Sequence, residues 1–327
     1  LDWTSTIAII PWNIYMFYGD HKLLADCYEN IRRYVDYVDR TSPTGLTSWG
    51  RGDWVPVKSH SSKELTSSVY FYVDTKILAN AAKMFNKTED YKYYSALANK
   101  IKNAINDKFL NRETGIYGSG VQTEQSVPLQ WGIVPEELKR KVARNLAKQV
   151  EAAGFHLDVG VLGAKAILNA LSENGEAETA YKLAAQDTYP SWGCWIANGA
   201  TTLLENWDLN ATRDISDNHM MFGEIGGWFY KGLGGIFPDP ENPGFKHILL
   251  RPNFTSGLNE FEARYQSPYG EICSKWERKK NRIVYHVTVP ANSTATFYAP
   301  DNVKGERAVN LEAGKHILEL PIKRAVY

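Results

Sequence analysis

The sequence predicts a chain of two parts, a ring of helical hairpins followed by an antiparallel β-sandwich. From Ile7 to about Gly235, apolar residues recur every three or four positions, the spacing of helices with one buried face. Phe237–Gly244 then brings together three prolines and a glycine, which break helices. Beyond it, short runs alternate between apolar and polar residues, as half-buried strands do. We therefore expect one domain over residues 1–236 and a second over 237–327.

The first part should contain about ten helices, since helical stripes alternate with short loops along it. Leu23–Val38 has one continuous apolar face. Similar stripes cover Leu65–Met84, Asp90–Phe109, Pro135–Val150, Val159–Leu171 and Ala177–Ala185. Acidic residues after Thr88 and Pro135 mark helix starts, where the helix dipole favours negative charge. No repeat typical of a solenoid is visible, so a closed ring of hairpins is favoured.

The second part alternates as strands do over Arg282–Val289, Ala295–Ala299 and His316–Leu320. Turn-forming residues separate these runs at 267–270, 279–281 and 290–292. About ninety residues of this pattern are enough for an antiparallel β-sandwich. Its only tryptophan is Trp276, and we expect it to be a structural domain rather than a glycan-binding one.

Charge and cysteine content exclude several classes of function. Lys plus Arg and Asp plus Glu both number 37, and the chain has no basic run, which argues against a nucleic-acid partner. No apolar stretch approaches the length of about 18 residues that a transmembrane helix needs. Cys27, Cys194 and Cys273 are too widely spaced for a zinc site and are expected to be free thiols. We expect no metal, no cofactor and no membrane partner, and the sequence leaves the cellular compartment open.

Aromatic residues make up 13% of the chain, and several lie in loops rich in glycine. The segment Trp49–Pro56 holds two Trp, two Gly, an Arg and an Asp. One interpretation is that Asp53 binds sugar hydroxyls beside a tryptophan platform. The alternative is a tight turn whose tryptophan fills the core.

A second aromatic loop surrounds Glu205, which we expect at the end of a helix of small residues. Trp192, Trp195 and Trp207 lie close to it in the sequence. A carboxylate among aromatic rings suits a general base, and Trp192 is expected to contact the substrate. The alternative is an ordinary glutamate on a helix surface.

Two further polar segments are weaker candidates. Asp217 and His219 directly precede an apolar helix, so Asp217 is also a candidate N-cap and His219 a candidate core residue. Gln122–Gln125 and His156–Asp158 are equally suited to capping helices. Together, the carboxylates and aromatic loops favour glycoside chemistry, which needs two carboxylates and no cofactor.

At these residues the sequence resembles the inverting α-L-rhamnosidases of glycoside hydrolase family 78. The resemblance runs through the helical part, over Trp3, Ile10–Tyr15, Gly52–Trp54, Gly160–Gly163, Tyr189–Gly193, Gly199–Thr202, Glu205–Asp208, Asn218–His219 and Phe222–Gly223. It continues in the second part over Pro243–Lys246, Ser267–Gly270 and Val289–Asn292. Each match is short, but together they span nearly the whole chain in order.

The resemblance implies an (α/α)6 barrel, a C-terminal β-sandwich and release of terminal α-L-rhamnose from glycosides or polysaccharides. It implies that Glu205 is the general base that activates water. It also implies that His219 binds the sugar and that Trp3 and Trp54 line the rhamnose pocket. Asp53 lies in the same loop as Trp54 and is expected to be a hydroxyl ligand.

One departure concerns the general acid, which the family carries in an Asp-Cys-Pro…Glu…Gly-Asp stretch. No Asp-Cys-Pro occurs in these 327 residues. We therefore expect the acid upstream of Leu1, an incomplete barrel lacking its first helices, and a chain that is inactive or weak alone. Two alternatives stay open: another (α/α)6 glycosidase, such as an α-glucosidase, and a non-catalytic carbohydrate-binding module.

Overall fold

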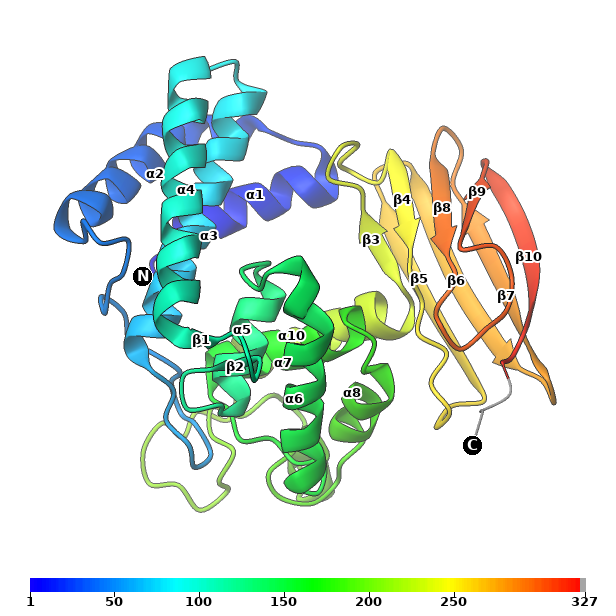
Figure 1. Cartoon of the computed structure of the whole chain (residues 1–327). Helices are drawn as coiled ribbons and strands as arrows, with labels where there is room; N and C mark the ends of the chain where they lie inside the picture. The colour runs from blue at the N-terminus through cyan, green and yellow to red at the C-terminus, as the bar shows by residue number, and fades with distance from the viewer. Residues whose placement is uncertain (324–327) are drawn as a thin grey trace. The chain divides into compact units, whose positions relative to one another are not determined.

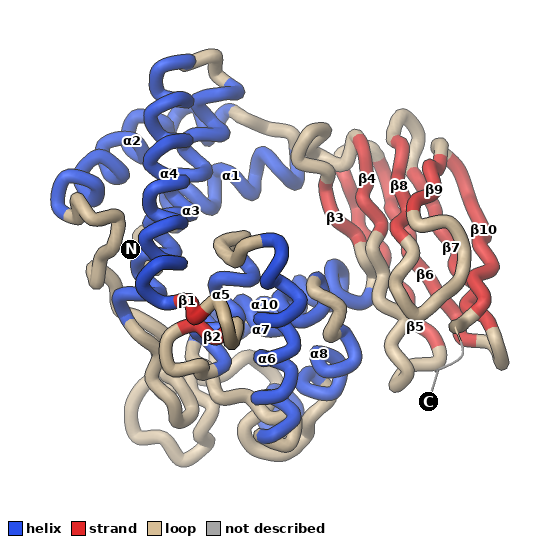
Figure 2. Tube along the Cα trace, in the orientation of Figure 1, coloured by secondary structure: helices blue, strands red, loops and turns tan. Residues whose placement is uncertain are grey.

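The computed structural model describes residues 1–323, and contacts within the chain divide it into two compact units. The helical unit comprises Leu1–Trp12 and His21–Glu224, and the sheet unit comprises Asn13–Asp20 and the residues from Ile225 onward. Figure 2 shows the corresponding change from helices to strands. The breaker cluster at 237–244 is not purely a linker, because the first strand of the sheet unit begins at Ile236 and ends at Pro238.

Ten α-helices occur in residues 1–323, which agrees with the number expected from the sequence. They are α1 (Thr6–Tyr18), α2 (Lys22–Thr41), α3 (Lys63–Met84), α4 (Thr88–Phe109), α5 (Gln122–Gln130), α6 (Lys139–Ala152), α7 (Val161–Glu173), α8 (Ala177–Ala184), α9 (Trp192–Ala197) and α10 (Glu224–Trp228). Short 3-10 helices cover η1 (Glu136–Leu138) and η2 (Met220–Phe222), and one π-helical turn covers η3 (Phe229–Leu233). A two-residue hairpin, β1 (Leu110–Asn111) and β2 (Ile116–Tyr117), follows α4.

The helices pack as sequential hairpins because their apolar faces need partners. α2 buries one stripe that includes Leu24, Ile31 and Val38, and it packs against α3. α3 is buried on nearly all sides and lies beside α4, as Figure 1 shows. α5 and α7 form a second central pair, flanked by α6 and α8. The stripes expected over α2, α3, α4, α6, α7 and α8 are therefore confirmed.

The helix expected to end at Glu205 is absent. α9 ends at Ala197, and the chain from Gly199 to Asn218 has no regular helix or strand. Gly199 has a φ of +88°, a left-handed conformation that ends the helix. The run of small residues that suggested a helix instead forms part of a long loop.

The sheet unit contains two four-stranded sheets. Their strands are β3 (Ile236–Pro238), β4 (His247–Leu250), β5 (Glu260–Ser267), β6 (Gly270–Arg278), β7 (Arg282–Val289), β8 (Thr294–Tyr298), β9 (Ala308–Leu311) and β10 (Gly314–Pro321). One sheet has the order β10-β7-β6-β5 and is antiparallel throughout. The other has the order β3-β4-β8-β9, and its central pair, β4 and β8, is parallel. The sandwich is thus confirmed, with one parallel pair that the sequence pattern did not reveal.

The core of the sandwich follows from the alternation along its strands. In β7 every second residue from Ile283 to Val289 is buried, as the pattern predicts. Trp276 is fully buried, and its Nε1 donates to the carbonyl of Leu233 at 3.3 Å. This tryptophan is therefore a core residue and offers no sugar-binding surface.

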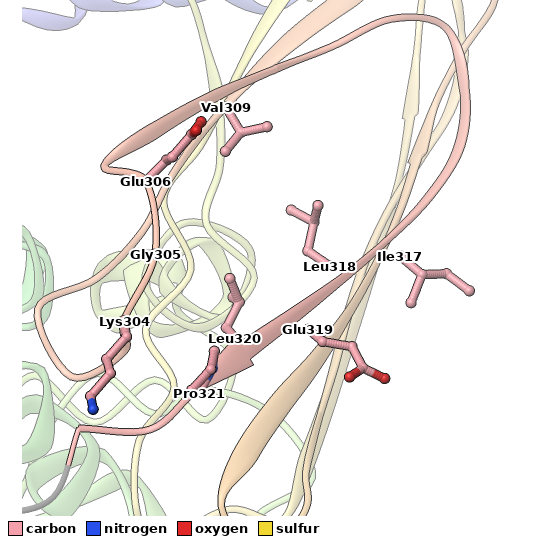
Figure 3. A pocket seen from close by; sticks show the side chains of 9 residues that line it. All are labelled: Lys304, Gly305, Glu306, Val309, Ile317, Leu318, Glu319, Leu320 and Pro321. Carbon is pink, nitrogen blue, oxygen red and sulfur yellow. The ribbon is translucent and has the colours of Figure 1, made fainter.

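A hollow of about 480 Å³ lies beside β10 in the sheet unit. Figure 3 shows Leu318 and Leu320 directed toward it, while Ile317 and Glu319 point the other way, as alternation along a strand requires. None of its lining residues, all within the described chain, is aromatic. The hollow therefore lacks the flat rings on which sugars stack.

The three cysteines are free thiols, as expected: Cys194 and Cys273 are buried and Cys27 is half-buried. In residues 1–323, no helix has both the length and the apolar character needed to cross a membrane.

Candidate active site

The loop of residues 49–62, between α2 and α3, is held in place at its start by Asp2. The Asp2 carboxylate accepts hydrogen bonds from the backbone N–H groups of Arg51 (3.1 Å) and Gly52 (2.8 Å). A Cβ on Gly50 would lie only 2.4 Å from Oδ2 of Asp2, so any larger residue at position 50 would displace the carboxylate. Asp2 did not stand out in the sequence, because its partners lie about fifty residues away.

Asp53 fastens the middle of this loop to the start of α7. Its Oδ2 accepts from Thr123 Oγ1 at 2.5 Å and Gly160 N at 2.8 Å. Its Oδ1 accepts from Leu162 N at 2.7 Å and Gly163 N at 3.1 Å. Each carboxylate oxygen thus has two protein donors, which leaves no position for a sugar hydroxyl.

The expectation that Asp53 is a hydroxyl ligand is therefore wrong. Burial raises its pKa, while the hydrogen bonds from Thr123 and from the backbone of α7 act in the opposite direction. Asp53 therefore has a structural role, because its carboxylate holds the loop to the start of α7.

Two further carboxylates fasten the end of the loop. Asp158 accepts from the N–H of Lys58 (3.0 Å) and from the N–H (2.9 Å) and hydroxyl (2.6 Å) of Ser59. Glu124 accepts from the N–H of Ser62 at 2.7 Å and from Ser119. The interpretation of these segments as structural capping groups is supported.

Trp3 and Trp54 come together at the surface. Trp3 is 45% exposed, and its ring centroid lies 6.5 Å from that of Trp54 in an edge-to-face arrangement. The guanidinium carbon of Arg51 lies 5.6 Å from the Trp3 ring and 6.0 Å from the Trp54 ring. Two half-exposed indoles and a cation in one corner make a surface suited to stacking on a sugar.

Trp192, in contrast, belongs to a buried aromatic cluster. Its ring is 4% exposed, and its Nε1 donates to the carbonyl of Phe222 at 3.0 Å. Trp195 stacks on Trp207 with centroids 4.8 Å apart, and Trp207 packs against Phe222 at 4.3 Å. The expectation that Trp192 contacts substrate is wrong, because burial and a satisfied N–H make it a core residue.

In the loop of residues 199–219, the segment 203–205 is hydrogen-bonded to the segment 216–219. Leu203 accepts from the N–H of His219 (2.8 Å), and Glu205 donates its N–H to Ser216 (3.0 Å). Ser216 returns its N–H to Oε2 of the Glu205 side chain at 3.1 Å. The side chain of Glu205 retains 19% exposure. The sequence could not show Ser216 as a partner of Glu205, since the contact depends on the path of an irregular loop.

His219 lies beside Glu205 in a defined tautomer. Its Nδ1 accepts a hydrogen bond from the N–H of Met221 at 3.1 Å, so the proton of the ring is on Nε2. Nε2 lies 3.9 Å from Oε1 of Glu205, too far for a hydrogen bond but close enough for both groups to contact one small molecule. His219, rather than Asp217, therefore caps η2.

Both loops are attached to the start of α7. Val161 donates its N–H to the carbonyl of Trp54 at 2.9 Å, and Trp207 Nε1 donates to the carbonyl of Val159 at 2.8 Å. In Figure 1 the two loops lie at the same end of the helical unit, the first in blue and the second in yellow-green. The site thus combines one partly exposed carboxylate, one imidazole, one exposed indole (Trp3) and one half-buried indole (Trp54). No cluster of three or more metal-ligating side chains occurs in residues 1–323.

A unit of helical hairpins joined to a β-sandwich is the architecture of a six-hairpin glycoside hydrolase. The profile described as bacterial alpha-L-rhamnosidase 6 hairpin glycosidase domain matches residues 1–233. The profile for the bacterial alpha-L-rhamnosidase C-terminal domain matches residues 235–314. The chain therefore belongs to the bacterial α-L-rhamnosidase family.

Individual relatives agree with this assignment. An alpha-L-rhamnosidase of Formosa agariphila is 30% identical over 94% of this chain. The structure of the alpha-L-rhamnosidase from Dictyoglumus thermophilum matches with a TM-score of 0.89 and 32% identity, over 98% of this chain and 39% of its own. The Streptomyces avermitilis alpha-L-rhamnosidase complexed with L-rhamnose matches with a TM-score of 0.84 and 28% identity, over 97% of this chain and 32% of its own. The chain spans 29% and 35% of the length of two curated relatives.

Proposed function

We propose that this chain carries the general-base side of the active site of an α-L-rhamnosidase that releases terminal α-L-rhamnose with inversion. The observation that carries the proposal is the arrangement of Glu205, Ser216 and His219 in a chain that belongs to this family. The rhamnose complex of the Streptomyces avermitilis relative supports the choice of sugar.

In this proposal the two oxygens of Glu205 have different tasks. The N–H of Ser216 holds Oε2 and fixes the rotamer of the side chain. Oε1 is then the oxygen that accepts the proton of the attacking water. The carboxylate needs no cofactor for this step.

His219 is proposed to bind the sugar through Nε2–H, because its Nδ1 is already occupied by the N–H of Met221. Trp3 and Trp54 are proposed to line the rhamnose pocket, where the exposed ring of Trp3 and the half-buried ring of Trp54 offer apolar faces.

The proposal assigns the base but no residue of this chain as the acid. Inversion requires the acid carboxyl to lie about 6.5–9.5 Å from Glu205, leaving room for a water between the base and the sugar. The family resemblance places that acid in an Asp-Cys-Pro…Glu segment, N-terminal to the residues that match here.

Hydrolysis of p-nitrophenyl α-L-rhamnoside tests the proposal, measured for this chain, for Glu205→Gln and for any longer natural form that contains the Asp-Cys-Pro…Glu segment. We expect hydrolysis in the longer form and its loss on Glu205→Gln, with the β-anomer of L-rhamnose as the first product. Hydrolysis of p-nitrophenyl α-glucoside alone would replace the proposal with a glucosidase. Binding of L-rhamnose that survives Glu205→Gln, with no hydrolysis in any form, would indicate a binding module.

A further inference from the structure

Strand β10 is the edge strand of its sheet, and the hydrogen bonds at its end show which way its backbone groups point. The N–H of Ile322 donates to the carbonyl of Asn281 at 3.0 Å, on the side of β7. The carbonyl of Pro321 accepts from the N–H of Lys304 at 2.7 Å, on the opposite side. Because successive residues of a strand alternate in this direction, the odd-numbered residues of β10 direct their N–H and C=O groups away from β7.

The segment that contains Lys304 covers this outer edge only at the end of β10. Further back along the strand, the outward backbone groups of Lys315, Ile317 and Glu319 have no hydrogen-bond partner among residues 1–323. An edge of this kind is able to pair with the edge of another strand.

The side chains on this stretch of β10 carry opposite charges on either side of an apolar residue. Lys315 is exposed, Ile317 is 66% exposed, and the side chain of Glu319 is 63% exposed. Figure 3 shows Ile317 and Glu319 directed away from the hollow, and alternation along the strand places Lys315 on the same face. Glu319 also forms a surface ion pair with Arg282 of β7 at 3.4 Å, and a carboxylate is able to accept from two cations at once.

This order of charges is complementary to itself. When two copies of β10 run antiparallel with Ile317 opposite itself, Lys315 of each copy lies opposite Glu319 of the other. The backbone groups of these residues face the other copy, so each of them belongs to a hydrogen-bonded pair. Opposite charges directly across two strands stabilise the pairing, whereas an edge with charges of one sign would keep the copies apart.

We propose that β10 is an interface at which two copies of this chain pair, antiparallel and with two-fold symmetry about Ile317. The β10-β7-β6-β5 sheets of the two copies then form one continuous sheet. The exposed side chain of Ile317 packs against its equivalent in the other copy and loses contact with water. No residue of the candidate active site takes part, so the inference is independent of the proposed function.

Sedimentation equilibrium at protein concentrations from about 5 µM to about 500 µM measures this association. We expect a monomer–dimer equilibrium with a dissociation constant of about 10–100 µM, because one pair of strands buries less surface than a permanent interface. Lys315→Glu and Glu319→Lys should each raise this constant at least about tenfold, since the symmetry places the resulting like-charge pair in the dimer twice.

The double variant, Lys315→Glu with Glu319→Lys, should restore the dimer, because it exchanges the two charges and keeps them complementary. Lys280→Glu reverses an exposed charge in the turn before β7 and is the matched control, which should leave the association unchanged. All of these positions are exposed, so the thermal unfolding temperature should stay the same in every variant and show that each is folded.

A cysteine at position 317 tests the register independently of charge. In a hydrogen-bonded antiparallel pair the two Cα atoms lie about 5.5 Å apart, which a disulfide spans. Ile317→Cys should therefore form a disulfide-linked dimer on mild oxidation, detected by non-reducing electrophoresis. Lys315→Cys should not, because the two copies of position 315 lie roughly 13 Å apart along the strands. The unsubstituted protein, with its own free cysteines, is the control.

A protein that stays monomeric at about 500 µM would overturn the inference. A dimer that neither single charge reversal weakens would also overturn it, since the two copies would then meet at another surface. Failure of the double variant to restore the dimer, or equal cross-linking through positions 315 and 317, would contradict the pairing about Ile317.

Discussion

The two loops attached to the start of α7 use the same residue types for opposite purposes. In the loop of residues 49–62, the carboxylates are enclosed by backbone donors and the indoles of Trp3 and Trp54 meet solvent. In the loop of residues 199–219, the indole of Trp207 is buried and the carboxylate of Glu205 is partly exposed.

The difference shows that hydrogen-bond partners decide the role of a residue, not its type or the density of a motif. Asp53 has four donors and Trp207 has an acceptor in Val159, so both serve the fold. The Glu205 side chain accepts one hydrogen bond, from the backbone N–H of Ser216 to Oε2, which leaves Oε1 for the proposed role as base. Substitutions in the two loops test this difference, and the pH dependence of stability tests a buried carboxylate on α3.

The largest expected effect is that of Glu205→Gln on hydrolysis by a longer natural form that contains the Asp-Cys-Pro…Glu segment. We expect the rate to fall by about 10²–10⁴-fold, because an amide cannot accept the proton of water. The amide oxygen still accepts the N–H of Ser216, so the thermal unfolding temperature should stay unchanged. Glu312→Gln, on an exposed position of the sheet unit, is the control and should retain full activity. Retained activity in Glu205→Gln would remove Glu205 from the mechanism.

Trp207→Ala and Trp3→Ala test the difference between the indoles. Removing Trp207 should lower the free energy of unfolding by about 3–5 kcal/mol, since it empties a buried aromatic cluster. Removing Trp3 should lower it by less than about 1 kcal/mol, because nearly half of the side chain is already exposed. Urea unfolding measures both. Trp3→Ala should nevertheless weaken the affinity for a rhamnoside about tenfold, which titration with the rhamnoside measures. Similar losses of stability in the two variants would contradict the comparison.

Asp53→Asn tests whether the first loop depends on its carboxylate. In asparagine, an NH2 group would replace one of the two carboxylate oxygens and would face the two donors that this oxygen accepts from. We therefore expect a loss of about 2–3 kcal/mol in the free energy of unfolding. Asp217→Asn, on an exposed aspartate of the second loop, should cost less than about 0.5 kcal/mol. If the two variants unfold at the same urea concentration, the enclosed carboxylate is not what holds the loop.

Asp74 on α3 should make the stability of the protein depend on pH, with a small change for each pH unit. It is fully buried, accepts from Ser5 Oγ at 2.7 Å, and has no partner at Oδ1. Burial raises its pKa from 3.8 to about 8. The folded state therefore binds a proton that the unfolded state releases near pH 4. The resulting stability is complete below that pH and is lost as pH rises toward 8.

The free energy of unfolding should thus fall by at most about 1.4 kcal/mol per pH unit across this window. Asp74→Asn should remove that decline. Urea unfolding at about pH 5, 6.5 and 8 measures the slope for both proteins. Equal slopes would mean that Asp74 is ionised in the folded state.

Much of the fold was predictable because it rests on local periodicity. A helix or strand with one buried face shows a regular spacing of apolar residues in the sequence. This is the case for Leu24–Val38 and for Ile283–Val289. The parallel pairing of β4 with β8 was not predictable, since it joins segments 47 residues apart with no local signal. The irregular course of residues 199–218 was missed because small residues suit both helix and loop.

The candidate site was predictable in composition and only partly in role. The family resemblance drew attention to the two loops that contain Asp53 and Glu205, and both loops are hydrogen-bonded to the start of α7. The sequence could not show whether Asp53 binds a sugar or holds a loop, nor whether Trp192 stacks on a sugar or fills the core. Each pair of roles calls for the same type of side chain. Ser216 carried no signal in the sequence, because it contacts Glu205 through its backbone N–H.

The amino-acid sequence was enough to predict a helical part followed by strands, and to indicate the family, because these features depend on local periodicity and on the order of short motifs along the chain. The three-dimensional structure was needed to see which carboxylates hold loops in place, which indoles are exposed and which oxygen of Glu205 has no protein donor. Those properties depend on donors and acceptors supplied by residues as far as 110 positions away, such as Gly163 for Asp53, and a linear pattern does not contain them.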